Sequence, residues 1–143
     1  GVQLEVGSVA TDFEHRSFAE ELRICRRYFW SPINAGWTGD EGAYLVEGIY
    51  YGSSKMTTHW YHPEEMRTSP TVSFATGSSY YNIYRADGAD TFSSLGSVLN
   101  PNSKSATRFT LMEIQSNVSG SGGDSGIVGA SNSNVYVHFS AEL

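Results

Sequence analysis

The stretch TRFTLMEIQ, Thr107 to Gln115, alternates between two sets of side chains along its whole length. Phe109, Leu111 and Glu113 fall on one face of an extended chain, and the residues between them fall on the other face. Such a period of two predicts a β-strand. The closing stretch VYVHFSAEL alternates in the same way, and its predicted inward residues are Val135, Val137, Phe139, Ala141 and Leu143.

Further strand-like segments lie upstream of these two stretches. They cover residues 2–6, 43–51, 55–61, 71–75 and 80–84. Polar loops rich in Gly, Ser and Pro separate them, at residues 31–42, 62–70, 93–105 and 117–126, and Asp87-Gly88 is a tight-turn signal. About seven or eight short strands with such loops favour an antiparallel β-sandwich of jelly-roll type.

One segment before the strands has helical spacing instead. Ser17 is a good N-cap and Glu20 follows three residues later, which is the pattern of a capping box. Pro32 ends the segment. The predicted fold is therefore all-β, an antiparallel sandwich preceded by one short N-terminal α-helix, which packs on a sheet or bundles with copies of itself. The residues on one face of this helix are Phe18, Leu22, Cys25 and Phe29.

The composition limits the classes of function. The 143 residues are 39% hydrophobic and 13% aromatic, enough for the core of one domain. A net charge of −6, with no basic run longer than Arg26-Arg27, argues against a nucleic-acid partner. The single Cys25 excludes an internal disulfide and a multi-cysteine zinc site. We expect no membrane insertion, since no apolar run is long enough, and the strand-like start GVQLEVGS indicates a fragment of a longer protein.

Three short patterns resemble sites of chemistry. GGDSG at residues 122–126 resembles a serine-protease nucleophile loop, but no histidine stands in a matching context, so we interpret it as a hairpin loop. His59 and His62 would point to opposite sides of a strand, which disfavours a metal site. The loop carboxylates have no spacing that would pair two of them across a sugar. We therefore predict a protein without enzymatic activity, catalytic residues, metal or cofactor.

The aromatic residues are more informative. Tyr50-Tyr51, Trp60-Tyr61 and Tyr80-Tyr81 are adjacent pairs, so each should place one ring inside the sandwich and one outside. Exposed Tyr and Trp rings offer flat surfaces on which sugars stack, although any one ring more often fills the core or a subunit interface. The candidate ligand-binding residues are Trp37, Asp40, Trp60, Tyr61, Tyr80, Tyr81, Asn82, Tyr84, Arg85 and Asp87.

Four phrases of the sequence resemble one family. ATDFEHR at residues 10–16, and EEL at 20–22 followed by Cys25, Arg27 and Tyr28, resemble a link and helix near the C-termini of tail fibre and tailspike proteins of tailed phages. EMRTSPTV at residues 65–72 and the closing VYVHFSAEL look like the terminal domain of the same proteins. The match is specific over the first 30 residues and looser afterwards.

The resemblance implies a linker strand plus helix over residues 1–30 and a receptor-binding β-sandwich over residues 31–143. It implies a homotrimer at the distal, extracellular end of the fibre or tailspike of a virion. The implied partner is a host surface polysaccharide or lipopolysaccharide. Two alternatives remain open from the sequence, a structural module that trimerises and caps the fibre, and a domain that degrades polysaccharide.

Overall fold

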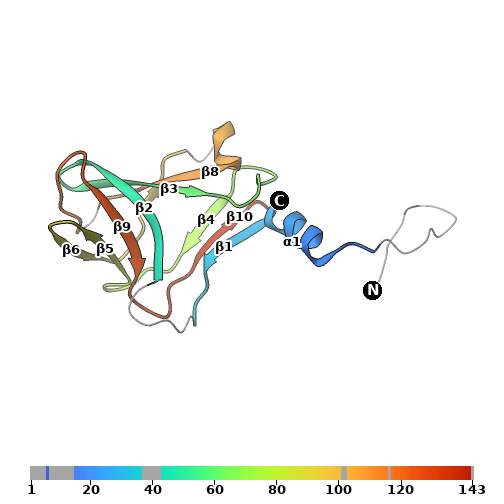
Figure 1. The fold of residues 1–143 in the computed structure, drawn as a ribbon, viewed down its shortest axis with the longest axis horizontal. Coiled ribbons are helices and arrows are strands. Elements are labelled where there is room, and N and C mark those ends of the chain that lie inside the picture. The colour runs from blue at the N-terminus through green and yellow to red at the C-terminus, as the bar shows by residue number, and fades with distance from the viewer. Residues whose placement is uncertain (1–5, 7–14, 37–42, 101–102, 116, 143) are drawn as a thin grey trace.

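The structure, a computed structural model, describes residues 6, 15–36, 43–100, 103–115 and 117–142. These residues form one α-helix and ten strands, with the helix to one side of the strands (Figure 1). The elements are α1 (Phe18–Arg26), β1 (Phe29–Ile33), β2 (Ala43–Gly52), β3 (Lys55–Tyr61), β4 (Thr71–Phe74), β5 (Tyr81–Arg85), β6 (Gly88–Phe92), β7 (Ser97–Val98), the 3-10 turn η1 (Lys104–Thr107), β8 (Phe109–Ile114), β9 (Ser125–Ala130) and β10 (Val137–Ser140).

The strands form two antiparallel sheets. A three-stranded sheet has the order β1-β10-β4, and a seven-stranded sheet has the order β6-β5-β9-β2-β3-β8-β7. The core lies between them, where Trp60 of the larger sheet packs on Phe139 of the smaller one with ring centroids 5.8 Å apart. The predicted all-β sandwich preceded by one helix is confirmed.

The two stretches with the clearest alternation form the strands that they predict. In β8 the side chains of Thr110, Met112 and Ile114 are buried, whereas Phe109 and Leu111 on the opposite face are only half-buried. Around β10 the inward set of the closing stretch is buried from residue 135 to 141, and Leu143 lies outside the described residues. The alternation identified the strands because each of them has one face in the core.

The helix begins where its cap predicts and ends earlier than expected. The Ser17 hydroxyl accepts a hydrogen bond from the Glu20 amide at 3.2 Å. The helix stops at Arg26, so the prediction that Phe29 lies on its apolar face was wrong. Phe29 instead begins β1, where it pairs with Ser140 of β10. The run of aromatic residues after Arg27 suits a strand better than a helix, which explains the change at this point.

Residues 31–42 were predicted to be a loop, and this was wrong for the first three of them. They belong to β1, which is an edge strand of the three-stranded sheet. An edge strand tolerates Pro32 because the ladder loses no hydrogen bond on the open side. The boundary predicted at residue 30 therefore falls inside β1, while the predicted strand at residues 2–6 lies outside the described residues apart from Val6.

The sequence missed β6, β7 and β9. The strand β9 matters most, since it lies between β5 and β2 in the larger sheet. Its sequence SGIVGA has small residues that rarely signal a strand. The structure gives a reason for one of them, because a Cβ on Gly126 would lie 2.9 Å from Ile83 Cγ2 and 3.2 Å from Met56 Cε. The glycine leaves room for these two core side chains.

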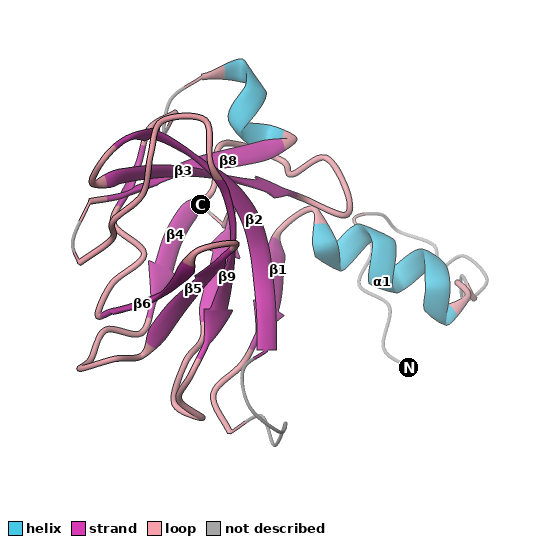
Figure 2. Cartoon of the chain, turned by 60° about the vertical axis from the view of Figure 1, so that its left-hand side comes forward, coloured by secondary structure: helices cyan, strands magenta, loops and turns pink. Residues whose placement is uncertain are grey.

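The helix α1 does not pack on either sheet of its own chain. None of its residues is buried, and the Phe18 side chain is 81% exposed. Figure 2 shows α1 standing beside the sandwich and joined to it through β1. This corrects one of the two arrangements that the sequence predicted, and bundling with copies of itself stays a prediction. Among the described residues, no helix has the length and apolar character needed to cross a membrane.

Candidate functional site

The three adjacent aromatic pairs lie as the strand pattern predicts. In each pair one ring is buried in the core and its neighbour is more exposed on the outer face of the seven-stranded sheet or at its end. The contrast is largest in β3, where Trp60 is 2% exposed and Tyr61 is 70% exposed. The inward rings are Tyr50, Trp60 and Tyr81, and the outward rings are Tyr51, Tyr61 and Tyr80.

Two of the candidate ligand residues are therefore core residues. Trp60 donates a hydrogen bond from Nε1 to Thr58 Oγ1 at 3.0 Å, and Tyr81 donates from its hydroxyl to the Ala75 carbonyl at 2.7 Å. Both side chains are enclosed and have their polar atoms satisfied inside the protein. The prediction that these two rings face a ligand was wrong, because the pleat turns them inward.

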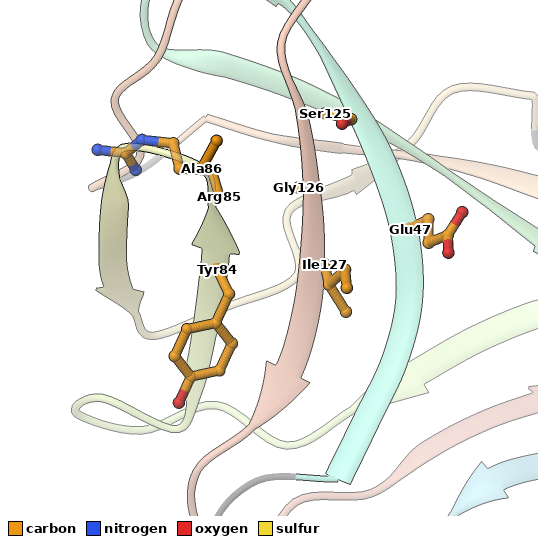
Figure 3. A pocket seen from close by; sticks show the side chains of 7 residues that line it. All are labelled: Glu47, Tyr84, Arg85, Ala86, Ser125, Gly126 and Ile127. Atoms are coloured by element: carbon orange, nitrogen blue, oxygen red, sulfur yellow. The ribbon is translucent and has the colours of Figure 1, made fainter.

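The other candidates on β5 lie beside a hollow in the outer face of the larger sheet. This hollow, here called the Tyr84 groove, has a volume of about 410 Å³ and crosses β5, β9 and β2 (Figure 3). Its size is within the range of small-molecule sites. Tyr84, Ile127 and Glu47 occupy directly opposed positions on the three strands, so their side chains form one row. The groove is lined by Glu47, Tyr84, Arg85, Ala86, Ser125, Gly126 and Ile127.

A second tyrosine, Tyr44, lies beside Tyr84. The rings of Tyr44 and Tyr84 meet edge to face, with centroids 6.2 Å apart. Tyr44, Gly129 and Asn82 are opposed on β2, β9 and β5. Because Gly129 has no side chain, the amide of Asn82 lies over it, and a Cβ there would come within 2.5 Å of Asn82 Oδ1. Asn82 Nδ2 donates to the Tyr84 hydroxyl at 3.1 Å, which holds that ring in place.

Asn82 has one polar atom without a partner. Its side chain is 6% exposed, and Oδ1 accepts no hydrogen bond within the described part of the chain. Buried polar atoms of native proteins almost always have a hydrogen-bond partner, so an unpaired one is unusual. The register places Asn82 and Tyr44 on either side of Gly129, on the face of the sheet that carries the groove.

Arg85 serves as a clamp at the end of the groove. Its Nε donates to Asp87 at 2.6 Å, its Nη1 to Asp90 at 2.5 Å and its Nη2 to the Ser119 hydroxyl at 3.3 Å. Figure 3 shows the guanidinium directed away from Ile127 and Glu47. Burial would raise the pKa of Asp90, but hydrogen bonds from the Ser119 amide and from Arg85 outweigh burial and lower it. Arg85 and Asp87 thus hold the β5–β6 hairpin.

The GGDSG motif forms the turn that enters β9. The Ser121 amide donates to Asp124 Oδ2 at 2.8 Å, and the Asp124 amide donates to the Ser121 carbonyl at 3.0 Å. This turn lines a second hollow of about 540 Å³, here called the turn hollow, which shares Arg85, Ala86 and Ser125 with the Tyr84 groove. Among their described lining residues there is no histidine to act as a base for a serine. The turn hollow is lined by Arg85, Ala86, Asp87, Ser121, Gly123, Asp124 and Ser125.

The remaining candidates do not join this group. Tyr61 lies on β3, and β9 and β2 separate that strand from β5. It forms its own cluster with the exposed His59 and the half-buried Phe109, with centroid distances of 6.3 Å and 5.9 Å from the Tyr61 ring. Tyr80 precedes β5 and packs partly against the core. Trp37 and Asp40 lie outside the described residues.

The two histidines of HWYH lie on different sides of β3, as predicted. His59 is exposed, whereas His62 is half-buried beside Phe139 at a centroid distance of 5.2 Å. Burial lowers the pKa of His62, and a hydrogen bond to the Thr107 carbonyl opposes that effect. Within the described residues, no three His, Cys, Asp or Glu side chains are grouped so that they could hold a metal ion.

Sequence reasoning missed most of the groove. Tyr44 and Glu47 stand in the predicted strand 43–51, but regular alternation would put them on opposite faces. A register shift between Tyr44 and Val46, which the sequence does not signal, separates the two residues. Ile127 and Ser125 carried no signal, since β9 itself was not predicted. Comparisons with protein-family models, with curated proteins and with solved structures find no match to this chain.

Proposed function

We propose that this chain is a receptor-binding domain of a phage tail fibre or tailspike, which binds a surface polysaccharide or lipopolysaccharide of the host without cleaving it. The proposal unites the resemblance of residues 10–28 to those proteins with the chemistry of the Tyr84 groove. The domain then works at the distal, extracellular end of the virion.

The observation that carries the proposal is the row of Tyr84, Ile127 and Glu47, together with the Tyr44 ring beside it. A sugar has one apolar face of C–H groups and a rim of hydroxyls. The exposed tyrosines and Ile127 offer an apolar surface for that face, while Glu47 and Ser125 offer hydrogen-bond partners for the rim. A few polar groups around an apolar floor are the usual composition of a ligand site.

The carboxylates at the groove support binding rather than cleavage. Glycoside hydrolysis needs two carboxyl groups that flank the scissile bond, one of them free to donate a proton. Asp87 and Asp90 both pair with the Arg85 guanidinium, so their carboxylates are already occupied. This leaves Glu47 as the unclamped carboxylate among the described residues of the Tyr84 groove.

A binding assay tests the proposal. The purified chain is applied to an array of bacterial surface polysaccharides and lipopolysaccharides, beside the variants Tyr84→Ala and Tyr28→Ala. Tyr28 is a matched control, because it is 40% exposed against 43% for Tyr84 and directly precedes β1 of the other sheet. We expect Tyr84→Ala to lose at least about tenfold in affinity, since ring contacts of this kind contribute ~1–2 kcal/mol, and Tyr28→Ala to bind normally. Binding to no glycan at all would refute the proposal.

The helix α1 favours a second role, as part of a trimerisation and capping module. A nine-residue helix is marginal in water by itself, yet α1 keeps Phe18 and Leu22 exposed. Helices of partner chains would cover that face in a homotrimer. Light scattering of wild type and Leu22→Asp tests this role, with Arg23→Asp as a control on the same helix. We expect trimers that only Leu22→Asp dissociates, and a wild-type monomer would contradict the role.

A further inference from the structure

The acidic side chains around the Tyr84 groove have no free basic side chain among the described residues to neutralise them. Arg85 is the one basic side chain among the described residues that line the groove and the turn hollow. Its donors are already directed to Asp87, Asp90 and Ser119. A guanidinium that is shared by two carboxylates has little attraction left for a third.

Two acidic side chains, in contrast, have no free basic side chain beside them among the described residues that line the two hollows. Glu47 lies exposed in the groove, and Asp124 lies exposed in the turn hollow. Lys55, at the start of β3, is engaged with Glu113 at 3.4 Å. The chain as a whole carries a formal charge of −6, so the rest of the molecule does not offset the field at the groove.

A neutral hydrogen-bond acceptor lies beside the groove, next to Tyr84. The Asn82 amide donates to the Tyr84 hydroxyl, and its enclosed Oδ1 has no partner within the described residues. A carbonyl oxygen accepts a hydrogen bond from a hydroxyl, an amide or an amine, but has nothing to offer a carboxylate or a phosphate. This atom and the carboxylate of Glu47 are both hydrogen-bond acceptors, so each binds a donor group.

We infer that the Tyr84 groove selects neutral or amine-bearing sugars and rejects sugars that carry carboxylate or phosphate groups. This inference rests on the glycan binding proposed above and narrows the class of glycan. An acidic group placed beside Glu47 would meet a like charge with no free cation to compensate it, which weakens binding by about tenfold at low ionic strength. A hydroxyl or an ammonium group at the same place donates to Glu47.

The test is an array that presents neutral, amine-bearing, uronate-bearing and phosphorylated bacterial glycans at low ionic strength. Wild type is compared with Glu47→Lys and with Glu142→Lys, which has the same change of net charge next to β10 of the other sheet. We expect wild type to bind neutral or amine-bearing glycans at least about tenfold more tightly than acidic ones. Glu47→Lys should shift that preference toward acidic glycans, and Glu142→Lys should leave it unchanged.

The possible outcomes distinguish a failure of the charge selection from a failure of glycan binding. The charge selection would be overturned if wild type bound acidic glycans most tightly and Glu47→Lys did not change that preference. The proposal of glycan binding would still hold in that case. A shift of equal size in Glu142→Lys would overturn it too, since net charge alone would then explain the preference. Binding of no glycan by a folded wild-type chain would overturn both proposals. Melting curves followed by circular dichroism verify that each variant is folded.

Discussion

The two faces of the seven-stranded sheet use aromatic residues from the same strands in opposite ways. On the inner face Trp60 is enclosed and makes a hydrogen bond to a residue of its own strand. On the outer face Tyr61 and Tyr84 are exposed. Neighbouring positions in one strand thus hold a ring that stabilises the fold, such as Trp60, and a ring that is accessible from solvent, such as Tyr61.

The residues that surround each ring also differ between the two faces. Inner rings are surrounded by apolar side chains such as Ile83 and Met112. Outer rings have polar neighbours, since Asn82 donates to the Tyr84 hydroxyl and Tyr51 donates to Glu113. An exposed ring held by a polar neighbour loses little freedom when it binds, which is the property a binding surface needs.

The largest expected effect comes from truncating an inner ring. Trp60→Ala should lower the free energy of unfolding by about 3–5 kcal/mol, because it removes a large buried side chain and leaves a cavity. The neighbouring variant Tyr61→Ala should cost less than ~1 kcal/mol. Chemical denaturation of both variants measures the difference. Equal losses would mean that the two faces do not differ as described.

A smaller effect should follow from crowding the inner face. In Gly126→Ala the new methyl group would approach Ile83 and Met56, so we expect a loss of ~1–3 kcal/mol in the free energy of unfolding. Gly122→Ala is the control, since the nearest atom to a Cβ there is 3.9 Å away. Thermal unfolding distinguishes the two variants. If Gly126→Ala unfolded at the same temperature as wild type, the core side chains would have to move aside for the methyl group.

The clamp at the edge of the groove should respond to pH. The folded pKa of Asp90 lies below its ordinary value of 3.8, so the clamp stabilises the protein above that pH. This contribution is lost as the pH falls from about 5 through the folded pKa. Unfolding measured between pH 7 and pH 3 should show a smaller loss in Asp90→Asn than in wild type. Parallel curves for the two proteins would contradict a clamped carboxylate.

The smallest effect concerns the polar support of an outer ring. The Tyr51 hydroxyl donates to Glu113, which raises the pKa of Tyr51 to about 12. A raised pKa means that this contact stabilises the protein below pH 10 and is lost as the pH rises toward about 12. Ultraviolet titration should find one tyrosine fewer ionising near pH 10 in wild type than in Glu113→Gln. Identical titrations would exclude the contact.

The architecture could be predicted from sequence wherever a strand has one buried face. The alternation at residues 107–115 and 135–141 reports directly which side chains face the core, and the capping box at Ser17 marks the start of α1. The prediction was wrong where the signal depends on a partner. Phe29 continues the helical spacing, but pairing with β10 draws it into a strand.

The groove could be predicted only in part. Tyr84 was a candidate because it is an aromatic residue among polar ones, and the structure places it in the groove wall. Its neighbours Ile127 and Glu47 come from strands far away in sequence, and only the register of β5, β9 and β2 aligns them. The role of Arg85 was equally hidden, since a lone sequence does not show that Asp87 and Asp90 share its guanidinium.

The central claim is that a host glycan binds on the outer face of the sheet, in the Tyr84 groove. The most direct test is a nuclear magnetic resonance titration of the chain with the oligosaccharide that binds most tightly on the array. Binding in the groove predicts that the largest chemical-shift changes fall on Tyr44, Glu47, Tyr84 and Ile127. Changes confined to α1 or to the three-stranded sheet, or no changes at all, would contradict it.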